Sequence, residues 1–223
     1  MLPLTIPPTK PRVLSAQLIP SPHPDLLNSL GSARKKGSYG LITCDRNHAL
    51  FTALDEATKA SPVTVLYAKS FYAGNVGTSG PLAGEAMGIL HGDDDEIVRE
   101  GLKATVQMLE DFAFYYMTPS GREIPFYPHV VSSLGTFLSK EAGLKAGEPM
   151  AYLIAPPIES IVALDAALKA SDTNLIKHFA PPTETNFGGG YLSGSLDACE
   201  AAAMAFAQKL IAISEQPMAN LSR

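Results

Sequence analysis

The sequence contains one nine-residue pattern twice. The first copy covers residues 53–61 (ALDEATKAS) and the second covers 163–171 (ALDAALKAS), at an offset of 110 residues (163 minus 53). A second pair, residues 89–92 (ILHG) and 191–194 (YLSG), lies at an offset of 102 (194 minus 92), so the first copy holds eight more residues, placed in the loop 73–83. A long-period repeat predicts a duplicated structural module, and this limits the chain to two similar domains.

The order of strand-like and helix-like stretches is the same in both halves. Helices are predicted over 47–60 and 158–170, because alanine and leucine recur at helical spacing and each stretch ends at an Ala-Ser pair. A β-branched stretch follows each helix, at 63–67 and 174–179. The pattern predicts an α+β fold with two modules, each an antiparallel sheet flanked by helices.

The likeness of the halves also sets the expected domain boundaries. Residues 1–11 hold several prolines and are predicted to form a flexible, proline-rich tail. Pro119 and Gly121 mark a turn between the modules. We therefore expect a tail over 1–11, a first domain over 12–117 and a second over 118–223.

Composition argues against several classes of protein. The net charge is −5 and the lysines are scattered, which argues against a nucleic-acid partner. No stretch reaches the ~20 apolar residues that span a bilayer, and the start lacks the apolar core of a signal peptide. Cys44 and Cys199 are too few for a disulfide framework, so we interpret both as small buried side chains in a reducing, cytoplasmic protein.

No residue pattern predicts a catalytic, cofactor or metal site. The five histidines are dispersed, and the acidic run 93–96 is better explained as the capped start of a helix than as a metal cluster. The glycine-rich segments 74–80 and 188–190 lack the lysine of a phosphate loop, and Ser193-Gly194-Ser195 lacks the spacing of a nucleophile elbow. We therefore expect no enzyme activity, no cofactor and no metal.

Two long loops occupy matching places in the two modules, at 74–81 and 181–190. In a symmetric assembly such loops can line an opening, whereas in a single chain they are ordinary surface loops. The residues alone leave both interpretations open.

Several segments resemble a known family. They are 38–43 (SYGLIT), 54–59 (LDEATK), 72–74 (YAG), 82–85 (LAGE), 150–157 (MAYLIAPP), 163–169 (ALDAALK) and 180–187 (APPTETNF). Over residues 12–215 the chain resembles the tandem-domain, circularly permuted shell proteins of bacterial microcompartments, of the EutL (ethanolamine utilization) and EtuB (ethanol utilization) type.

The resemblance implies a homotrimer that imitates a hexagon, tiles a microcompartment shell beside other shell proteins, and passes small polar metabolites. It implies that two loops gate a central pore, through Asn75, Gly77, Thr78, Thr183, Glu184, Thr185, Asn186 and Phe187. It also implies a smaller pore in each subunit, lined by Asp45, Asn47, Glu85 and Tyr115, although capping and core packing explain Asp45 and Tyr115 equally well.

In the family pattern, two carboxylates of the small pore hold the amine of ethanolamine. One falls on Glu85, but the other falls on Asn47, an amide. Losing one charge-assisted contact costs about 1–3 kcal/mol, which favours a neutral metabolite such as an alcohol or aldehyde. The alternative to a shell protein is a duplicated α+β regulator or enzyme that binds a small molecule, and the state of assembly separates the two.

Overall fold

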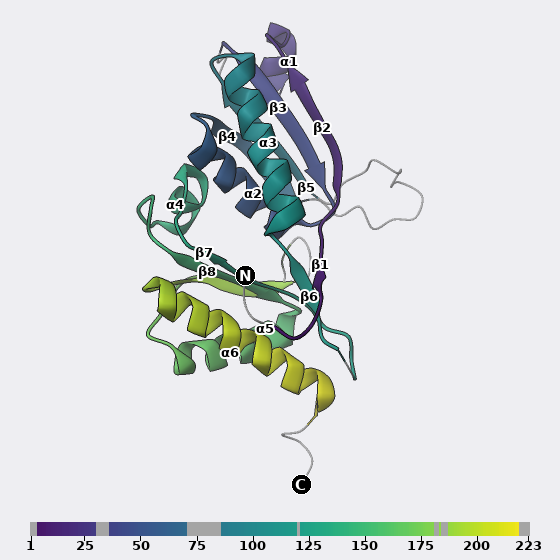
Figure 1. Ribbon diagram of the computed structural model, residues 1–223, viewed down its shortest axis with the longest axis vertical. Helices are drawn as coiled ribbons and strands as arrows, with labels where there is room; N and C mark the ends of the chain where they lie inside the picture. The colour runs from purple at the N-terminus through teal and green to yellow at the C-terminus, as the bar shows by residue number, and fades with distance from the viewer. Residues whose placement is uncertain are drawn as a thin grey trace. The chain divides into compact units, whose positions relative to one another are not determined.

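The computed structural model describes residues 4–29, 36–70, 86–119, 121–180, 183 and 187–218. The chain divides into two compact units (Figure 1). We call Pro11–Ala113 with Gly135–Glu141 the first-repeat unit, and Met1–Lys10 with Phe114–Leu134 and Ala142–Arg223 the second-repeat unit. Each unit thus includes a short segment from the other half of the chain. The expected boundary between 117 and 118 stays a prediction.

The first-repeat unit is a four-stranded antiparallel sheet with helices. Its strands follow the order β2-β3-β5-β4. Its elements are β2 (Val13–Ile19), α1 (Pro24–Ser29), β3 (Ser38–Cys44), α2 (Asn47–Ala60), β4 (Thr64–Ser70), β5 (Ala86–Gly92), α3 (Asp95–Asp111) and α4 (Thr136–Ala142).

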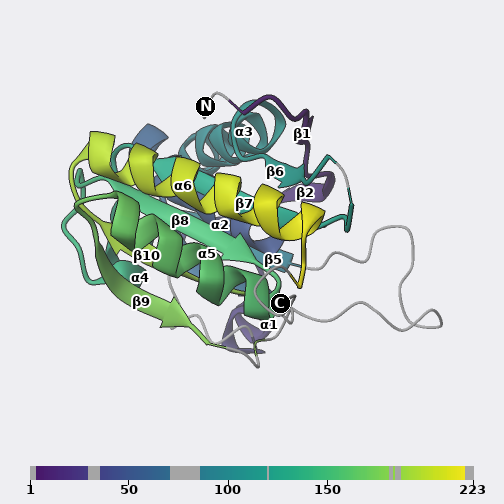
Figure 2. The same ribbon diagram turned by 90° about the horizontal axis from the view of Figure 1, so that it is seen from below.

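The second-repeat unit is built on a six-stranded antiparallel sheet of order β1-β6-β7-β8-β10-β9. Figure 2 shows its two helices, α5 and α6, lying side by side over this sheet. Its elements are β1 (Pro8–Thr9), β6 (Tyr115–Met117), β7 (Pro125–Val131), β8 (Met150–Ala155), α5 (Pro157–Ala170), β9 (Asn174–Phe179), β10 (Gly188–Ser193) and α6 (Leu196–Glu215).

The two sheets share one topology, which confirms the predicted duplication and the α+β fold. The order β2-β3-β5-β4 of one unit recurs as β7-β8-β10-β9 in the other. Helices α2 and α5, which carry the repeated sequence, are both 14 residues long, and each ends at the serine of its Ala-Ser pair. The proline that follows Ser61 excludes further helix in the first copy.

The proline-rich start of the chain differs from the flexible tail that the sequence predicted. Pro8 and Thr9 pair with Tyr116 and Tyr115 of β6, and Ile6 is buried in the hydrophobic core of the second-repeat unit. Prolines are compatible with the edge of a sheet, because an edge strand leaves one side unpaired. The segment is therefore part of the fold from at least Ile6 onward.

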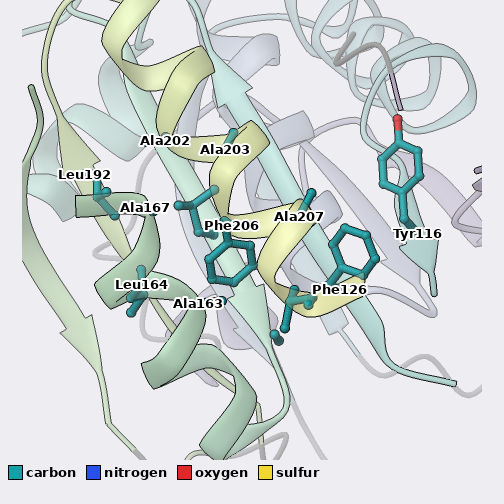
Figure 3. Packing of buried hydrophobic residues seen from close by; sticks show 14 of the residues in the cluster. Tyr116, Phe126, Ala163, Leu164, Ala167, Leu192, Ala202, Ala203, Phe206 and Ala207 are labelled. Carbon is teal, nitrogen blue, oxygen red and sulfur yellow. The ribbon is translucent and has the colours of Figure 1, made fainter. Parts of the chain in front are cut away.

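Small side chains bring the helices of the second-repeat unit close to each other and to the sheet. Figure 3 shows Phe206 of α6 between α5 and the strands, with Ala163 and Ala167 on the facing side of α5. Phe206, Ala203 and Ala207 are fully buried. A large ring among alanines fills the core at the density typical of protein interiors.

The acidic run 93–96 caps a helix, as the sequence favoured. The Asp94 carboxylate accepts a hydrogen bond from the backbone N–H of Ile97 at 2.9 Å, and Asp95 and Glu96 lie in the first turn of α3. Carboxylates at this end stabilise the helix dipole. Within the described residues, no group of His, Cys, Asp and Glu side chains is arranged to hold a metal ion.

One buried carboxylate joins the repeated helix α2 to the distant segment 135–141. Asp55 is completely buried; its Oδ2 accepts a hydrogen bond from the N–H of Gly135 at 2.7 Å, and its Oδ1 accepts one from Leu138 at 2.8 Å. Thr58 Oγ1 accepts a third from Thr136 at 2.9 Å. Burial raises the pKa of Asp55, while the two backbone donors favour the charged form and partly oppose that rise.

We expect Asp55→Asn to destabilise the first-repeat unit by about 1–3 kcal/mol, because an amide offers one acceptor where two backbone donors need two. The free energy of unfolding in urea measures the effect. The matched control is Glu56→Gln, whose side chain forms a partly exposed ion pair with Lys59 and should change stability by less than about 1 kcal/mol. Equal losses in the two variants would contradict a special role for Asp55.

Candidate functional site

The connection between β3 and α2 holds two of the residues predicted for the small pore, Asp45 and Asn47. The Asp45 carboxylate accepts hydrogen bonds from the backbone N–H of Arg12 at 2.7 Å and from its Nε at 3.1 Å. The N–H of Asp45 donates in return to the carbonyl of Arg12 at 3.2 Å. These bonds fasten the start of β2 to the end of β3. The guanidinium also offsets part of the negative charge of Asp45.

Asn47 begins α2 and is 7% exposed. Two residues near it in the sequence, His48 and Cys44, are uncharged at neutral pH, whereas Arg46, directly before it, is a cation. Burial lowers the pKa of His48 to about 3, so its imidazole is neutral. Burial also raises the pKa of the Cys44 thiol to about 12, so Cys44 is neither an anion nor a nucleophile. The carboxylate of Asp45 is therefore the negative charge in this connection.

Tyr115, the third of these residues that the structure describes, belongs to the second-repeat unit, whereas Asp45 and Asn47 belong to the first-repeat unit. It is 6% exposed, and its ring lies 4.8 Å from that of Tyr127 between centroids. This contact supports the core-packing interpretation of Tyr115. Glu85, the fourth, lies outside the described residues.

A run of aromatic contacts on one sheet of the second-repeat unit was not predicted from the sequence. Tyr152 of β8 contacts Tyr127 of β7 and Tyr191 of β10, and Tyr191 contacts Phe179 of β9. Lys177 lies over the Phe179 and Tyr191 rings at 5.7 Å. The signal in the sequence was at least one aromatic residue in each of these strands, but the strand register decides which of them meet. Burial holds the pKa of Tyr152 well above its usual value, so its hydroxyl stays protonated.

Two residues of the predicted gating loops, Thr183 and Phe187, are described and lie together. The Thr183 hydroxyl donates to the carbonyl of Phe187 at 2.5 Å, immediately before β10 begins. The other predicted gating residues, Asn75, Gly77, Thr78, Glu184, Thr185 and Asn186, lie outside the described residues. The structure therefore brings together one pair of the eight.

The glycine run 188–190 has a structural explanation. It opens β10, where Gly189 has a φ of +150° and a Cβ would overlap the carbonyl of Leu153 on the neighbouring strand. A Cβ on Gly188 would lie 2.5 Å from the Ser160 hydroxyl of α5. These glycines permit close packing of the backbone against β8 and α5.

Within the described residues, no helix is long and apolar enough to cross a membrane. Each module has a four-strand antiparallel motif with two helices beside it. The protein is therefore an α+β protein of two tandem modules. No family model matches the sequence.

Known proteins of this class match nearly the whole chain. The bacterial microcompartment shell protein EutL of Clostridium perfringens is 45% identical over 209 residues, which cover 94% of this chain and 96% of that protein. A crystal structure of EutL from Clostridium perfringens superposes with a TM-score of 0.91 and 43% identity, covering 99% of this chain and 100% of the other. EtuB from Clostridium kluyveri shares the fold alone, with 19% identity and a TM-score of 0.75 over 91% and 88% of the two chains.

The chain belongs to the EutL family of bacterial microcompartment shell proteins. The resemblance seen in the sequence motifs is therefore confirmed.

We expect Thr183→Ala to loosen the segment before β10, because it removes the hydroxyl that donates to the Phe187 carbonyl. The free energy of local opening should fall by about 1 kcal/mol. Hydrogen exchange of a peptide that covers residues 180–190 measures it. Thr183→Ser keeps the donor and should exchange like the parent chain. Equal exchange in the alanine variant would show that the bond contributes nothing.

Proposed function

We propose that this chain is a structural shell component whose copies assemble as homotrimers, tile a microcompartment shell in the cytoplasm beside other shell proteins, and pass metabolites through gated pores. The observation that carries the proposal is the duplicated fold in a chain 45% identical to a shell protein. Three copies of two similar modules supply six near-equivalent edges, and six edges around an axis are what a hexagonal layer needs.

The gate consists of the two loops that the sequence marked, 74–81 and 181–190. Loops placed alike in two related modules come to equivalent places around a pseudo-sixfold axis, where they line one central opening. The Thr183–Phe187 bond supports this role, because it holds two of the predicted gating residues together next to the start of β10. A single hydrogen bond of this kind costs little free energy to break.

The small pore of each subunit takes small polar metabolites without a net charge. Asn47 stands where the family pattern has a carboxylate, and Arg12 already occupies both oxygens of Asp45. A bound ammonium ion needs nearby anions to compensate for the water that it loses. Of the two carboxylates predicted for this pore, Asp45 is already paired with Arg12, so Glu85 is left as the other anion. Alcohols and aldehydes need only hydrogen bonds, which an amide and a carboxylate can supply.

The proposal predicts a trimer in dilute solution and flat sheets or tubes when the protein is concentrated. Light scattering after size exclusion measures the first, and negative-stain electron microscopy the second. The alternative of a duplicated α+β regulator or enzyme predicts a chain that stays a dispersed monomer. A monomer at every concentration would overturn the shell proposal and favour that alternative.

We expect the parent chain to bind ethanolamine weakly and Asn47→Asp to bind it about tenfold or more tightly, because the second carboxylate restores a charge-assisted contact. Isothermal titration calorimetry with ethanolamine, and with ethanol as the uncharged comparison, measures both. Asn47 is nearly buried, so thermal unfolding of the variant serves as a control for folding. Tight binding of ethanolamine by the parent chain would contradict the neutral pore.

A further inference from the structure

Helix α5 exposes three aliphatic side chains on one face. Ile158, Ile161 and Val162 are 74%, 49% and 36% exposed, and their spacing of three and four residues places them side by side. The opposite face of the same helix is buried against the core through Ala163, Leu164 and Ala167 (Figure 3). A contiguous apolar stripe on an otherwise well-packed helix marks a surface that another molecule covers.

The corresponding face of α2 is covered within the chain. At the offset of 110, His48, Phe51 and Thr52 are the counterparts of Ile158, Ile161 and Val162. Thr52 is only 2% exposed. The cover comes from the segment 135–141, where the Phe137 ring lies 6.5 Å from that of Phe51 between centroids and Leu138 is completely buried. The same helix face is thus closed in one repeat and open in the other.

The repeat identifies which segment would close the open face. Segment 135–141 lies between β7 and β8, and its counterpart between β2 and β3 is α1, since Thr136 and Pro24 begin these helices at an offset of 112. Leu27 of α1 packs on Tyr39 and Ile89 of its own unit. Leu26, the counterpart of the buried Leu138, is instead 42% exposed. Helix α1 therefore presents an exposed leucine where α4 has a buried one.

We propose that the exposed face of α5 is covered by α1 of a second copy of this chain, with Leu26 of that copy packed on Ile158 and Ile161. The inference rests on the proposed ring and names the contact that builds it. The contact joins two different surfaces, so it is a head-to-tail interface, and such an interface forms a ring when its rotation closes. The contact of α4 on α2 inside the chain is its template.

The proposed α1–α5 contact between copies differs at one position from the α4–α2 contact inside the chain. Gly135 lets its backbone reach α2, because a Cβ there would lie 2.5 Å from the Asp55 carbonyl oxygen. Its counterpart on the α1 side is His23, whose Cβ prevents an equally close approach. Asp165, the counterpart of Asp55, pairs instead with Lys169 at 2.6 Å. The interface between copies is therefore built from side chains rather than from backbone hydrogen bonds.

A cross-linking experiment tests the contact on the full chain. Asp25→Cys and Ile161→Cys place thiols at the counterparts of Phe137 and Phe51, and a short bis-maleimide should join them between subunits. The double variant should give dimers and closed trimers on a denaturing gel and nothing larger, whereas each single variant should give monomers. The native thiols of Cys44 and Cys199 are buried and do not compete.

The outcomes separate this inference from the ring on which it rests. A parent chain and double variant that are trimers by light scattering, yet do not cross-link, would overturn the α1–α5 contact and leave the shell proposal standing. A chain that never forms trimers would overturn both.

A second pair of variants measures the same contact without added thiols. Ile161→Lys should weaken trimer formation by about tenfold or more, because a lysine cannot replace a buried aliphatic side chain at an interface. Ile161→Val keeps the apolar contact and should assemble nearly as the parent does. Sedimentation over a range of concentrations gives the dissociation constants, and an unchanged constant for the lysine variant would contradict the proposal.

Discussion

The first-repeat unit depends on a carboxylate with no access to water. Asp55 lies on the helix that the sequence repeats, and its two oxygens accept hydrogen bonds from the backbone of residues 135 and 138, 80 and more positions away. A buried anion is costly unless donors surround it, so these bonds fix where the distant segment must lie. Local helix propensity could not place that segment. The polar contact does so because the N–H groups of Gly135 and Leu138 satisfy both oxygens of the carboxylate.

The repeat explains which parts of the fold were predictable. Helices α2 and α5 and the strands after them were predicted from periodicity and β-branched residues, which are local signals. Strand β7 (Pro125–Val131) contains Pro125 and Pro128, which locally argue against a strand. Strand β1 was missed for the same reason. In each case pairing with neighbouring strands outweighed the local effect of proline.

The candidate site was harder to predict than the fold, because it depends on contacts that no local pattern contains. The family resemblance implies that Asp45 and Tyr115 line one pore, which stays a prediction; the structure adds that Asp45 is bound by Arg12 from the start of β2 and that Tyr115 packs on Tyr127. Arg12 carries no motif that marks it as the partner of Asp45. Only the register of β2 against β3, in which Val13 lies opposite Cys44, brings the two together. A pairing of strands thus sets the charge of the site.

The two copies of the repeated helix show how one sequence serves two surroundings. Asp55 and Asp165 occupy the same place in the repeat, but one is completely buried under a segment of its own chain while the other makes a surface ion pair. Duplication supplies two related helix faces, and within the described residues α4 covers the face on α2 while Ile158, Ile161 and Val162 of α5 stay exposed. The face of α2 is satisfied within the chain, and the apolar residues kept on α5 make sense if its cover comes from another copy. Under the proposed contact, the uncovered face of α5 binds a second copy, and repetition of that contact around an axis would close a ring.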